Sequence, residues 1–283
     1  MTESRVARYY DWLSRYHSLV ARLGHTGGFD SLTVHRLLLP DRSGVAPADV
    51  VHDRLVTATR AMTSPRVVDA GCGFGGTILY LHARMGGHYD GLTLSRVQQA
   101  RAAREAARRG VTAACRFHVR NYDADLGDLV TDRADLIVAI ESLAHSSDPA
   151  RTVAHLSRWL RAGGRLAIVD DVPLDALPAD DPDFTAFRDG WSCPAIARDR
   201  PLSAALSAAH LTVEYEEDLT PLVALREPGA LERLVRVNRR WRPMLGRTSA
   251  GALVDSLYGG LMLERLYRRG VMRYRFVLAR LAG

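Results

Sequence analysis

A glycine-rich stretch directly after a short apolar run is the part of this sequence whose residue types most clearly suggest chemistry. The stretch reads RVVDAGCGFGGTILYL, and its glycines allow a ligand to approach the backbone closely. Gly71, Gly73 and Gly76 satisfy the G-x-G-x-x-G fingerprint of a dinucleotide site. Read from Asp69 to Gly75, the same residues satisfy a D-x-G-x-G-x-G pattern, which fits a nucleoside cofactor without a pyrophosphate.

The positions of the acidic residues separate these two patterns. A dinucleotide site needs an acid about 20 positions after the glycines, at the carboxyl tip of the second strand. Asp90 lies near that distance but inside the predicted strand HYDGLTL, whose tip carries Thr93 and Leu94 and is followed by Gln98. Asp69 ends the first strand, where its charge would repel a pyrophosphate and attract a cofactor with a cationic amino-acid end. The residues therefore favour the second pattern, with a nicotinamide-dependent reductase as the alternative.

The elements that must position these residues follow from an alternation of short apolar runs with helical patterns. Strands are predicted at residues 66–70, 88–94, 115–120, 134–140 and 165–171, with two final strands at one sheet edge, 211–218 and 272–281. Helices are predicted at 77–85, 95–110 and 148–164, the second capped by Ser95 and the third opened by Asp148. This order predicts an α/β fold with a doubly wound, seven-stranded, mostly parallel sheet and helices on both faces.

Three further segments are expected over the carboxyl ends of the strands, where open α/β sheets bind ligands. We expect residues 1–60 to form an N-terminal helical segment. Residues 61–283 are expected to form the Rossmann-like domain, with insertions at about 172–204 and 221–266. The N-terminal segment and the insertions together are expected to form a lid over the site.

The charge of the chain raises nucleic acid as a partner, since the net charge is +6 and the pI is about 9.5. Every cation is an arginine, however, and the arginines are spread along the chain, so we expect no nucleic-acid partner. Four of them, at 101, 104, 108 and 109, fall on one side of a predicted helix and indicate a solvated face. The densest cluster, residues 236–247, could hold an anionic substrate group or be solvated surface.

The remaining composition is that of an ordinary globular chain. No apolar run approaches the roughly 20 residues of a membrane helix, and the first residues lack the apolar core of a signal peptide. Cys72, Cys115 and Cys193 are the three cysteines, an odd and sparse set that indicates reduced thiols. These features together predict a cytoplasmic protein without a membrane span.

The order of the motifs resembles the class I S-adenosylmethionine-dependent methyltransferases. The motifs VVDAGCGFGG, YDGLTLSRVQ, NYD, ESLAHSSDP and LRAGGRLAIVDD follow one another up to residue 171, and the start YYDWLSRYHSLV is also similar. The resemblance is closest to the branch with sterol, tocopherol and cyclopropane-fatty-acid-type enzymes and bacterial natural-product methyltransferases. It implies S-adenosylmethionine as the cofactor and transfer of its methyl group to a small-molecule acceptor, on oxygen or carbon, in secondary metabolism such as antibiotic biosynthesis.

The resemblance also implies roles for residues along the cofactor. The glycine loop would hold the methionine end, the tip of the second strand the ribose, and the NYD motif the adenine, and a tyrosine near the start would close over it. The implied cofactor residues are Tyr10, Asp69, Gly71, Gly73, Gly75, Thr93, Leu94, Gln98, Tyr122, Asp123 and Glu141. Simpler readings remain open for some of them: Gln98 as a surface helix residue, Glu141 as a loop cap and Tyr10 as a core aromatic.

Catalysis would fall to residues after the fourth and fifth strands. Related O-methyltransferases place a catalytic histidine where His145 stands, and an ordinary histidine pKa suits a general base. Asp170 could orient His145 or a substrate hydroxyl. Asp170 and Asp171 also raise a magnesium site, but Glu141 is the one further candidate ligand and is assigned to the cofactor, so no metal is expected.

Several aspects of function stay open at this stage. The acceptor cannot be identified, and the aromatic residues of the insertions suggest a bulky, partly apolar molecule or ordinary core. A methyltransferase-like binding protein without turnover is an alternative to an enzyme. The tyrosine-rich start would suit a homo-oligomer.

Overall fold

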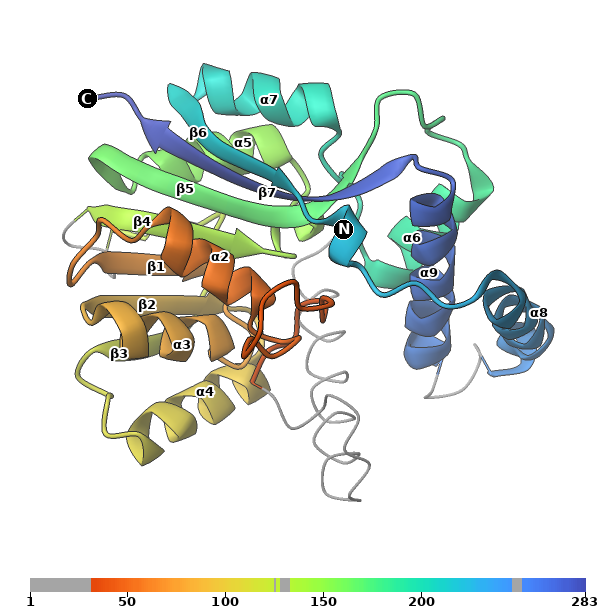
Figure 1. Cartoon of the computed structure of the whole chain (residues 1–283), viewed down its shortest axis with the longest axis horizontal. Helices are drawn as coiled ribbons and strands as arrows, with labels where there is room; N and C mark the ends of the chain where they lie inside the picture. The colour runs from red at the N-terminus through yellow and green to blue at the C-terminus, as the bar shows by residue number, and fades with distance from the viewer. Residues whose placement is uncertain (1–31, 125, 128–132, 246–250) are drawn as a thin grey trace.

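The computed structural model describes residues 32–124, 126–127, 133–245 and 251–283, and Figure 1 shows their arrangement. Seven strands form one sheet in the order β3-β2-β1-β4-β5-β7-β6. The strands are β1 (Arg66–Ala70), β2 (His88–Thr93), β3 (Cys115–Val119), β4 (Ala134–Ile140), β5 (Leu160–Pro173), β6 (Leu211–Asp218) and β7 (Met272–Leu281). The first five are parallel, and β7 pairs antiparallel with both β5 and β6. The predicted mostly parallel sheet, with its two final strands at one edge, is confirmed.

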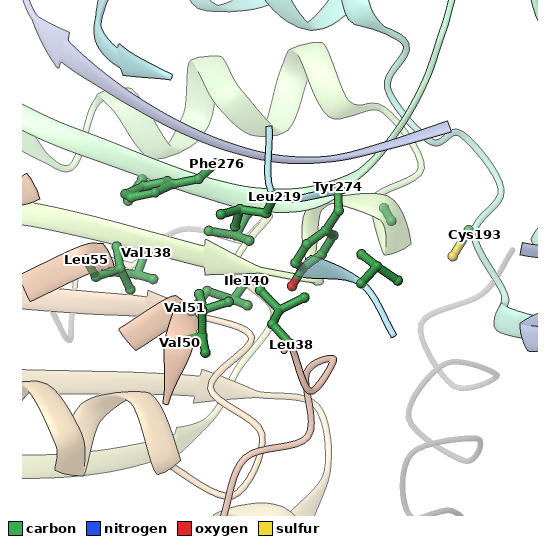
Figure 2. Packing of buried hydrophobic residues seen from close by; sticks show 14 of the residues in the cluster. Leu38, Val50, Val51, Leu55, Val138, Ile140, Cys193, Leu219, Tyr274 and Phe276 are labelled. Carbon is green, nitrogen blue, oxygen red and sulfur yellow. The ribbon is translucent and has the colours of Figure 1, made fainter. Parts of the chain in front are cut away.

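Helices cover both faces of this sheet. The helices are α2 (Val50–Ala58), α3 (Gly76–Met85), α4 (Arg96–Arg108), α5 (Pro149–Ser157), α6 (Pro182–Trp191), α7 (Asp199–Ala208), α8 (Pro228–Leu245) and α9 (Gly251–Arg268), with short 3-10 turns η1 (Leu143–His145) and η2 (Thr220–Leu222). Successive strand residues point to opposite faces, so Val138 packs with α2 and α3 and Ile137 packs with α5 and α7. Figure 2 shows the α2 side of this core, where Val51 and Leu55 lie beside β4.

Local capping explains where the helices begin. The Ser95 side chain accepts a hydrogen bond from the Gln98 backbone N–H at the start of α4, and Gly110, with φ of 70°, follows its end. Asp148 accepts from the Arg151 N–H at the start of α5, and Pro149 takes the first helical position. The predicted starts of both helices are confirmed.

The predicted end of the helix 148–164 is wrong. The helix ends at Ser157, and strand β5 begins at Leu160, which pairs with Ala134 of β4. Gly163 has a φ of 72°, and regular pairing between β4 and β5 resumes only at Leu136 and Arg165. Gly163 and Gly164 therefore form an irregularity inside the long strand β5. The helical pattern of these residues is overridden because the backbone pairs with β4 instead.

Only some of the segments that we expected over the strand ends lie there in the structure. Helix α7 begins inside the insertion predicted at 172–204 but packs beside α5 on a face of the sheet. Within residues 1–60, α2 also packs on a sheet face, and residues 32–49 contain no helix. Helices α6 and α9 stand beyond the end of the sheet, with α8 outside them (Figure 1). The lid expected of residues 1–60 stays a prediction, since residues 1–31 lie outside the described part.

Helices α6 and α9 cross at two glycines. A Cβ added to Gly190 would lie 2.4 Å from the Asp255 carbonyl oxygen and 3.0 Å from the Gly259 Cα. Because no side chain separates the backbones at this point, the neighbouring Trp191 can reach α9, where its indole Nε1–H donates to the Ser256 carbonyl at 3.0 Å. This crossing fixes the position of the aromatic side chains on α6.

We predict that Gly190→Ala destabilises the protein by about 1–3 kcal/mol, since the added methyl meets backbone atoms that cannot move aside without shifting α9. Gly229→Ala is the matched control, because the Arg233 side chain, at 3.7 Å, is the only neighbour of its new methyl. Urea unfolding of both variants measures the effect. An equal stability for the two would contradict close packing at this crossing.

Candidate functional site

A cavity of about 480 Å³ lies at the carboxyl ends of β1, β2, β4 and β5. The predicted site residues that line it are Asp69, Gly71, Gly73, Thr93, Leu94, Gln98, Tyr122, Asp123, Glu141, His145 and Asp170. Gly75 is described but does not line it, and Tyr10 lies outside the described residues. The far wall comes from α6, the loop after it and α9, through Phe187, Trp191, Cys193, Leu253 and Leu257.

The glycine loop has the backbone that its sequence suggests. Gly71, Gly73 and Gly75 have φ values of 106°, 52° and 82°, in the region that favours glycine. Added Cβ atoms would meet Ser142 at 2.5 Å from Gly71 and Val34 at 2.6 Å from Gly73. At Gly75 the Cβ would instead meet Phe117 at 2.6 Å, so this glycine serves helix packing under the loop.

Asp69 provides an unsatisfied carboxylate at this loop. It is buried, lines the cavity, and its Oδ2 has no hydrogen-bond partner among the residues that the structure describes. Burial raises the pKa of Asp69 to about 7. A buried polar atom without a partner indicates that a ligand with hydrogen-bond donors or positive charge completes the site. Ser142 Oγ, on the same cavity wall, likewise has no partner within the described ranges.

The tip of β2 forms a polar cluster inside the cavity. Gln98 is 4% exposed, which excludes the reading of a surface helix residue. Its Oε1 accepts a hydrogen bond from the Thr93 hydroxyl at 2.7 Å, which orients its amide N–H groups as donors for a ligand. Asp90, by contrast, lies inside β2 and pairs with Arg116 at 3.0 Å and His118 at 2.8 Å on β3. Asp90, the acid that a dinucleotide site would need, therefore lies away from the strand tip, and its carboxylate is bound by Arg116 and His118.

The NYD motif lies on the neighbouring wall. The Tyr122 hydroxyl donates to the Ser142 carbonyl at 2.7 Å, which holds the ring against the loop after β4. Asp123 accepts a hydrogen bond from the Thr152 hydroxyl and also lines the cavity. Their assignment to the adenine stays a prediction.

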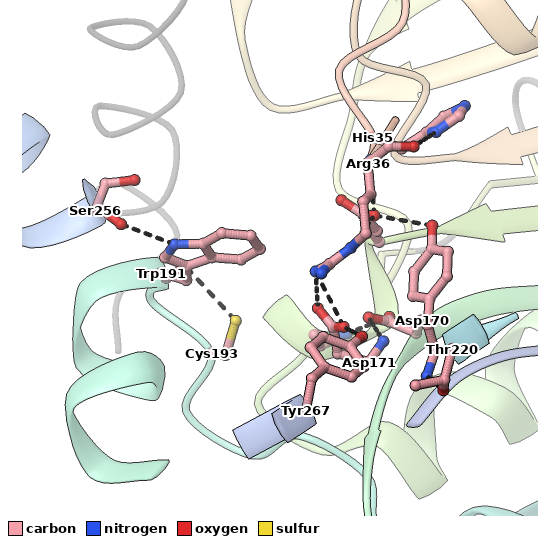
Figure 3. A network of polar contacts seen from close by, with 12 residues as sticks. His35, Arg36, Asp170, Asp171, Trp191, Cys193, Thr220, Ser256 and Tyr267 are labelled. Carbon is pink, nitrogen blue, oxygen red and sulfur yellow. Dashed lines mark hydrogen bonds and ion pairs between the residues drawn. The ribbon is translucent and has the colours of Figure 1, made fainter. Parts of the chain in front are cut away.

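A partly buried arginine that the sequence did not single out joins several parts of the site. The Arg36 backbone N–H donates to Glu141 Oε1 at 2.8 Å, and its guanidinium donates to both oxygens of Asp171, at 3.1 and 3.0 Å. The guanidinium also lies over the rings of Tyr267 and Tyr274, at 5.0 and 5.1 Å from their centroids (Figure 3). Arg36 thus ties the segment before α2 to β4, β5, α9 and β7.

This network defines the environment of the two carboxyls. Burial raises the pKa of Glu141 and of Asp171 above their usual range, although Arg36 opposes the shift. Tyr274 donates its hydroxyl to Glu141 at 2.9 Å, and Tyr267 donates to Asp171. Glu141 lines the cavity with a φ of 47° but gives its carboxylate to Arg36 and Tyr274. Its predicted contact with the cofactor stays a prediction.

The segment that carries Arg36 forms another wall of the cavity, through Leu32, Thr33, Val34 and His35. The ring of His35 lies against that of His52 on α2, with 3.0 Å between the two Nε2 atoms. Burial, with the His52 charge as a second cause, lowers the pKa of His35 to about 3. His35 is therefore neutral at physiological pH. No sequence motif marked this segment, because its role depends on contacts made across more than 100 residues.

His145 lines the cavity between the strand ends and the wall formed by α6 and α9. Its Nδ1 is 3.3 Å from the Ser192 carbonyl oxygen and 3.9 Å from Cys193 Sγ. Donation from Nδ1 to this carbonyl selects the tautomer whose Nε2 carries the lone pair. Burial lowers the pKa of His145. The histidine is therefore neutral and has the protonation state of a base near neutral pH.

Asp170 is held by backbone groups. Its carboxylate accepts from the Ala144 N–H at 3.0 Å and from the Asp171 N–H at 2.9 Å. Burial raises the pKa of Asp170 well above its usual range. Asp170 therefore orients η1, the turn that carries His145, and its predicted direct role toward His145 or a substrate hydroxyl stays a prediction.

Metal-binding clusters and membrane-spanning helices are both missing from the described residues. They contain no group of three or more His, Cys, Asp or Glu side chains arranged to hold a metal ion. Asp171 and Glu141, which the sequence raised as magnesium ligands, are bound by Arg36. No helix in the same part of the chain is both long and apolar enough to cross a membrane.

A family model described as a methyltransferase domain matches residues 68–166, the segment that holds the glycine loop, the β2 tip and the NYD motif. This segment is thus similar to a methyltransferase domain, and the chain resembles the class I S-adenosylmethionine-dependent methyltransferases. Its curated relatives include tocopherol and sterol methyltransferases, as the resemblance implied. The chain shares 31% identity with the methyltransferase GfsG of Streptomyces halstedii over 170 residues, which are 58% of this chain and 59% of the relative.

Solved structures show the same fold over the whole chain. A geranyl diphosphate methyltransferase, solved with geranyl diphosphate and sinefungin, matches with a TM-score of 0.73 and 21% identity and covers 98% of both chains. The [4+2]-cyclase SpnF matches with a TM-score of 0.72 and 21% identity, over 100% of this chain and 97% of its own. The matched regions span between 28% and 59% of the length of the first curated relatives. The reaction of this methyltransferase therefore has to be argued from its own site.

We predict that Arg36→Met lowers the unfolding free energy by about 3–5 kcal/mol. The change removes the guanidinium that donates to both oxygens of the buried Asp171 and lies 3.9 Å from Glu141, while the backbone N–H bond to Glu141 remains. The further change Asp171→Asn should then cost less in the Arg36→Met background than in the wild type, with a coupling of about 0.5–3 kcal/mol. Urea unfolding of the wild type, the two single variants and the double variant measures this coupling as a double-mutant cycle. Additive losses would show that the two side chains do not stabilise each other.

Proposed function

We propose that this methyltransferase transfers a methyl group from S-adenosylmethionine to a hydroxyl of an uncharged, largely apolar small molecule, with His145 as the general base. The observation that carries the proposal is one cavity that joins the glycine loop to a neutral histidine and an apolar helical wall. The relatives named as O-methyltransferases of fungi support oxygen as the acceptor atom.

The cofactor end of the cavity fits S-adenosylmethionine. Asp69 has an unsatisfied carboxylate for a cationic amino group, and the β2 tip offers Thr93 and Gln98 to ribose hydroxyls. Tyr122 supplies a ring beside the nucleoside, and Asp123 an acceptor for an exocyclic amine. When bound, S-adenosylmethionine supplies an electrophilic methyl group on a sulfonium. Asp69, Gly71 and Gly73 would hold its amino-acid end, and the cavity walls would exclude water from it.

The acceptor end is built for an apolar body with one polar group. Phe187, Trp191 and Leu257 provide apolar surface on α6 and α9, and His145 stands at their border with the strand ends. A hydroxyl within reach of Nε2 could transfer its proton there, while alignment against the wall supplies proximity. The cavity also carries the acids Asp69, Asp123, Glu141, Asp170 and Asp171. Arg120 is the arginine among the described residues of this lining, and the nearby Arg36 is taken up by Glu141 and Asp171. The described lining therefore lacks the cluster of cations that a diphosphate ester would need, and such an ester is not expected as substrate.

A binding protein without turnover is the second candidate. The match to a cyclase structure bears on it only in one respect, because it shows that the fold by itself does not specify methyl transfer. Both candidates bind the cofactor in the same way, so formation of methylated product from labelled S-adenosylmethionine separates them. Absence of product with every hydroxylated candidate, together with tight cofactor binding, would favour the second.

We predict that cofactor affinity depends on pH through Asp69. Its pKa of about 7 means that the carboxyl is protonated below this pH and ionised above it, so attraction to a cationic amine is lost as pH falls. Between pH 8 and pH 6, binding of S-adenosylhomocysteine should weaken about tenfold more in the wild type than in Asp69→Asn. Calorimetric titration measures both proteins, and the amine of the ligand titrates equally in each. A parallel pH dependence would remove Asp69 from the site.

We predict that His145→Ala lowers turnover by about 10²–10⁴-fold and leaves cofactor affinity near that of the wild type. The wild-type rate should rise with pH and level off with a midpoint below 6.5, because burial lowers the pKa of His145 and its neutral form is the base. Cys193→Ala is the control, since it removes a neighbour of the same ring without removing the base. A loss below tenfold in His145→Ala, or an unchanged pH profile, would assign the proton to another acceptor.

A further inference from the structure

The arginine cluster that the sequence analysis left open lies, as far as residue 245, on α8, the helix farthest from the sheet (Figure 1). Arg247 lies outside the described residues. One face of α8 is buried, through Leu231 and Val235, and contacts α9. The proposed methyl transfer uses none of the α8 side chains, since none of them lines the cavity. The outer surface of this helix therefore needs its own explanation.

Four large apolar side chains form a stripe on that outer surface. Leu234, Val237, Trp241 and Met244 are 43%, 56%, 47% and 66% exposed. Their spacing of three, four and three residues places them on one side of a helix with 3.6 residues per turn. Single exposed apolar residues are ordinary, but a continuous row along about three turns marks a contact surface.

Exposed arginines lie on the same helix, and two of them border this stripe. Arg233, Arg236, Arg239 and Arg240 are exposed, and the 100° step of a helix puts Arg233 and Arg240 directly beside the apolar row. The one acid of α8, Glu232, pairs with Arg265 of α9. The outer surface of α8 is therefore apolar along its centre and positively charged along its edge.

We propose that α8 docks on the surface of anionic lipid membranes, lying in the plane of the headgroups. A row of Leu, Val, Trp and Met would enter the boundary of the acyl chains, and the arginines would contact the lipid phosphates. Trp241 fits this location, because its ring has an apolar body and a polar N–H. Docking against a second copy of the chain is disfavoured, since pairing two α8 helices would bring eight arginines together.

Binding of the full chain to vesicles tests the proposal. We expect sedimentation with vesicles of phosphatidylglycerol and phosphatidylcholine, little with phosphatidylcholine alone, and release on raising the salt concentration. Each arginine near an anionic surface is worth about fivefold in partition. The variant R233Q/R236Q/R239Q/R240Q should therefore lose at least tenfold. Val237→Ser/Trp241→Ser should also weaken binding by at least tenfold, and Trp fluorescence of the wild type should shift to the blue.

A matched variant controls for total charge. R101Q/R104Q/R108Q/R109Q on α4 removes the same number of charges from a helix that belongs to another surface, so it should retain binding within about threefold. Equal losses from the α4 and α8 variants, or no binding to anionic vesicles at about 0.1 M salt, would overturn the proposal. A dimer in sedimentation velocity that the Val237→Ser/Trp241→Ser change dissociates would assign the stripe to a second copy.

Discussion

The buried guanidinium of Arg36 is the interaction on which the site depends. Two carboxyls, Glu141 and Asp171, follow neighbouring strands and face the same interior, where neither could remain ionised alone. Arg36 brings a cation from a segment far away in the sequence and so fixes three chain segments at once. Val34, two residues before Arg36, packs against Gly73 of the glycine loop. Tyr267 of α9 lies under the Arg36 guanidinium. The glycine loop and the α9 wall of the cavity are therefore both next to the Arg36 contacts. The shape of the cavity is thus a product of charge neutralisation as well as of hydrophobic packing.

Most of the fold could be predicted because local signals and sheet pairing agree. The strands of the sheet are short apolar runs bounded by glycines or caps, and Ser95 and Asp148 begin helices in sequence and structure alike. Residues 158–164 could not be predicted, because their helical pattern lost to pairing with β4. The placement of α2 and α7 on the sheet faces also follows from tertiary contacts that an amphipathic pattern does not specify.

The residues of the candidate site could be predicted where they follow a single strand and are close together in the sequence. The glycine loop, Thr93 and Gln98 belong to this class, because the residues that work together are close in sequence. Arg36 and Ser142 were missed, since each gains its importance from a partner on another segment. The role of Gly75 toward the ligand stays a prediction, because a pattern of glycines does not show which of them faces a cavity and which faces a phenylalanine ring.

The outermost strand, β6, shows how the sheet ends without inviting another chain. An exposed edge strand offers unpaired backbone groups and is a site for aggregation. In β6, however, acidic side chains recur along the strand, and Glu214 and Glu216 form ion pairs with Arg165 and Arg275 of the next strands. A slip by one residue would separate these charges, so the pairs help to fix the register. A second copy of β6 pairing at this edge would set its acids opposite these ones and compete for the arginines that they already bind, which disfavours the addition of a further strand.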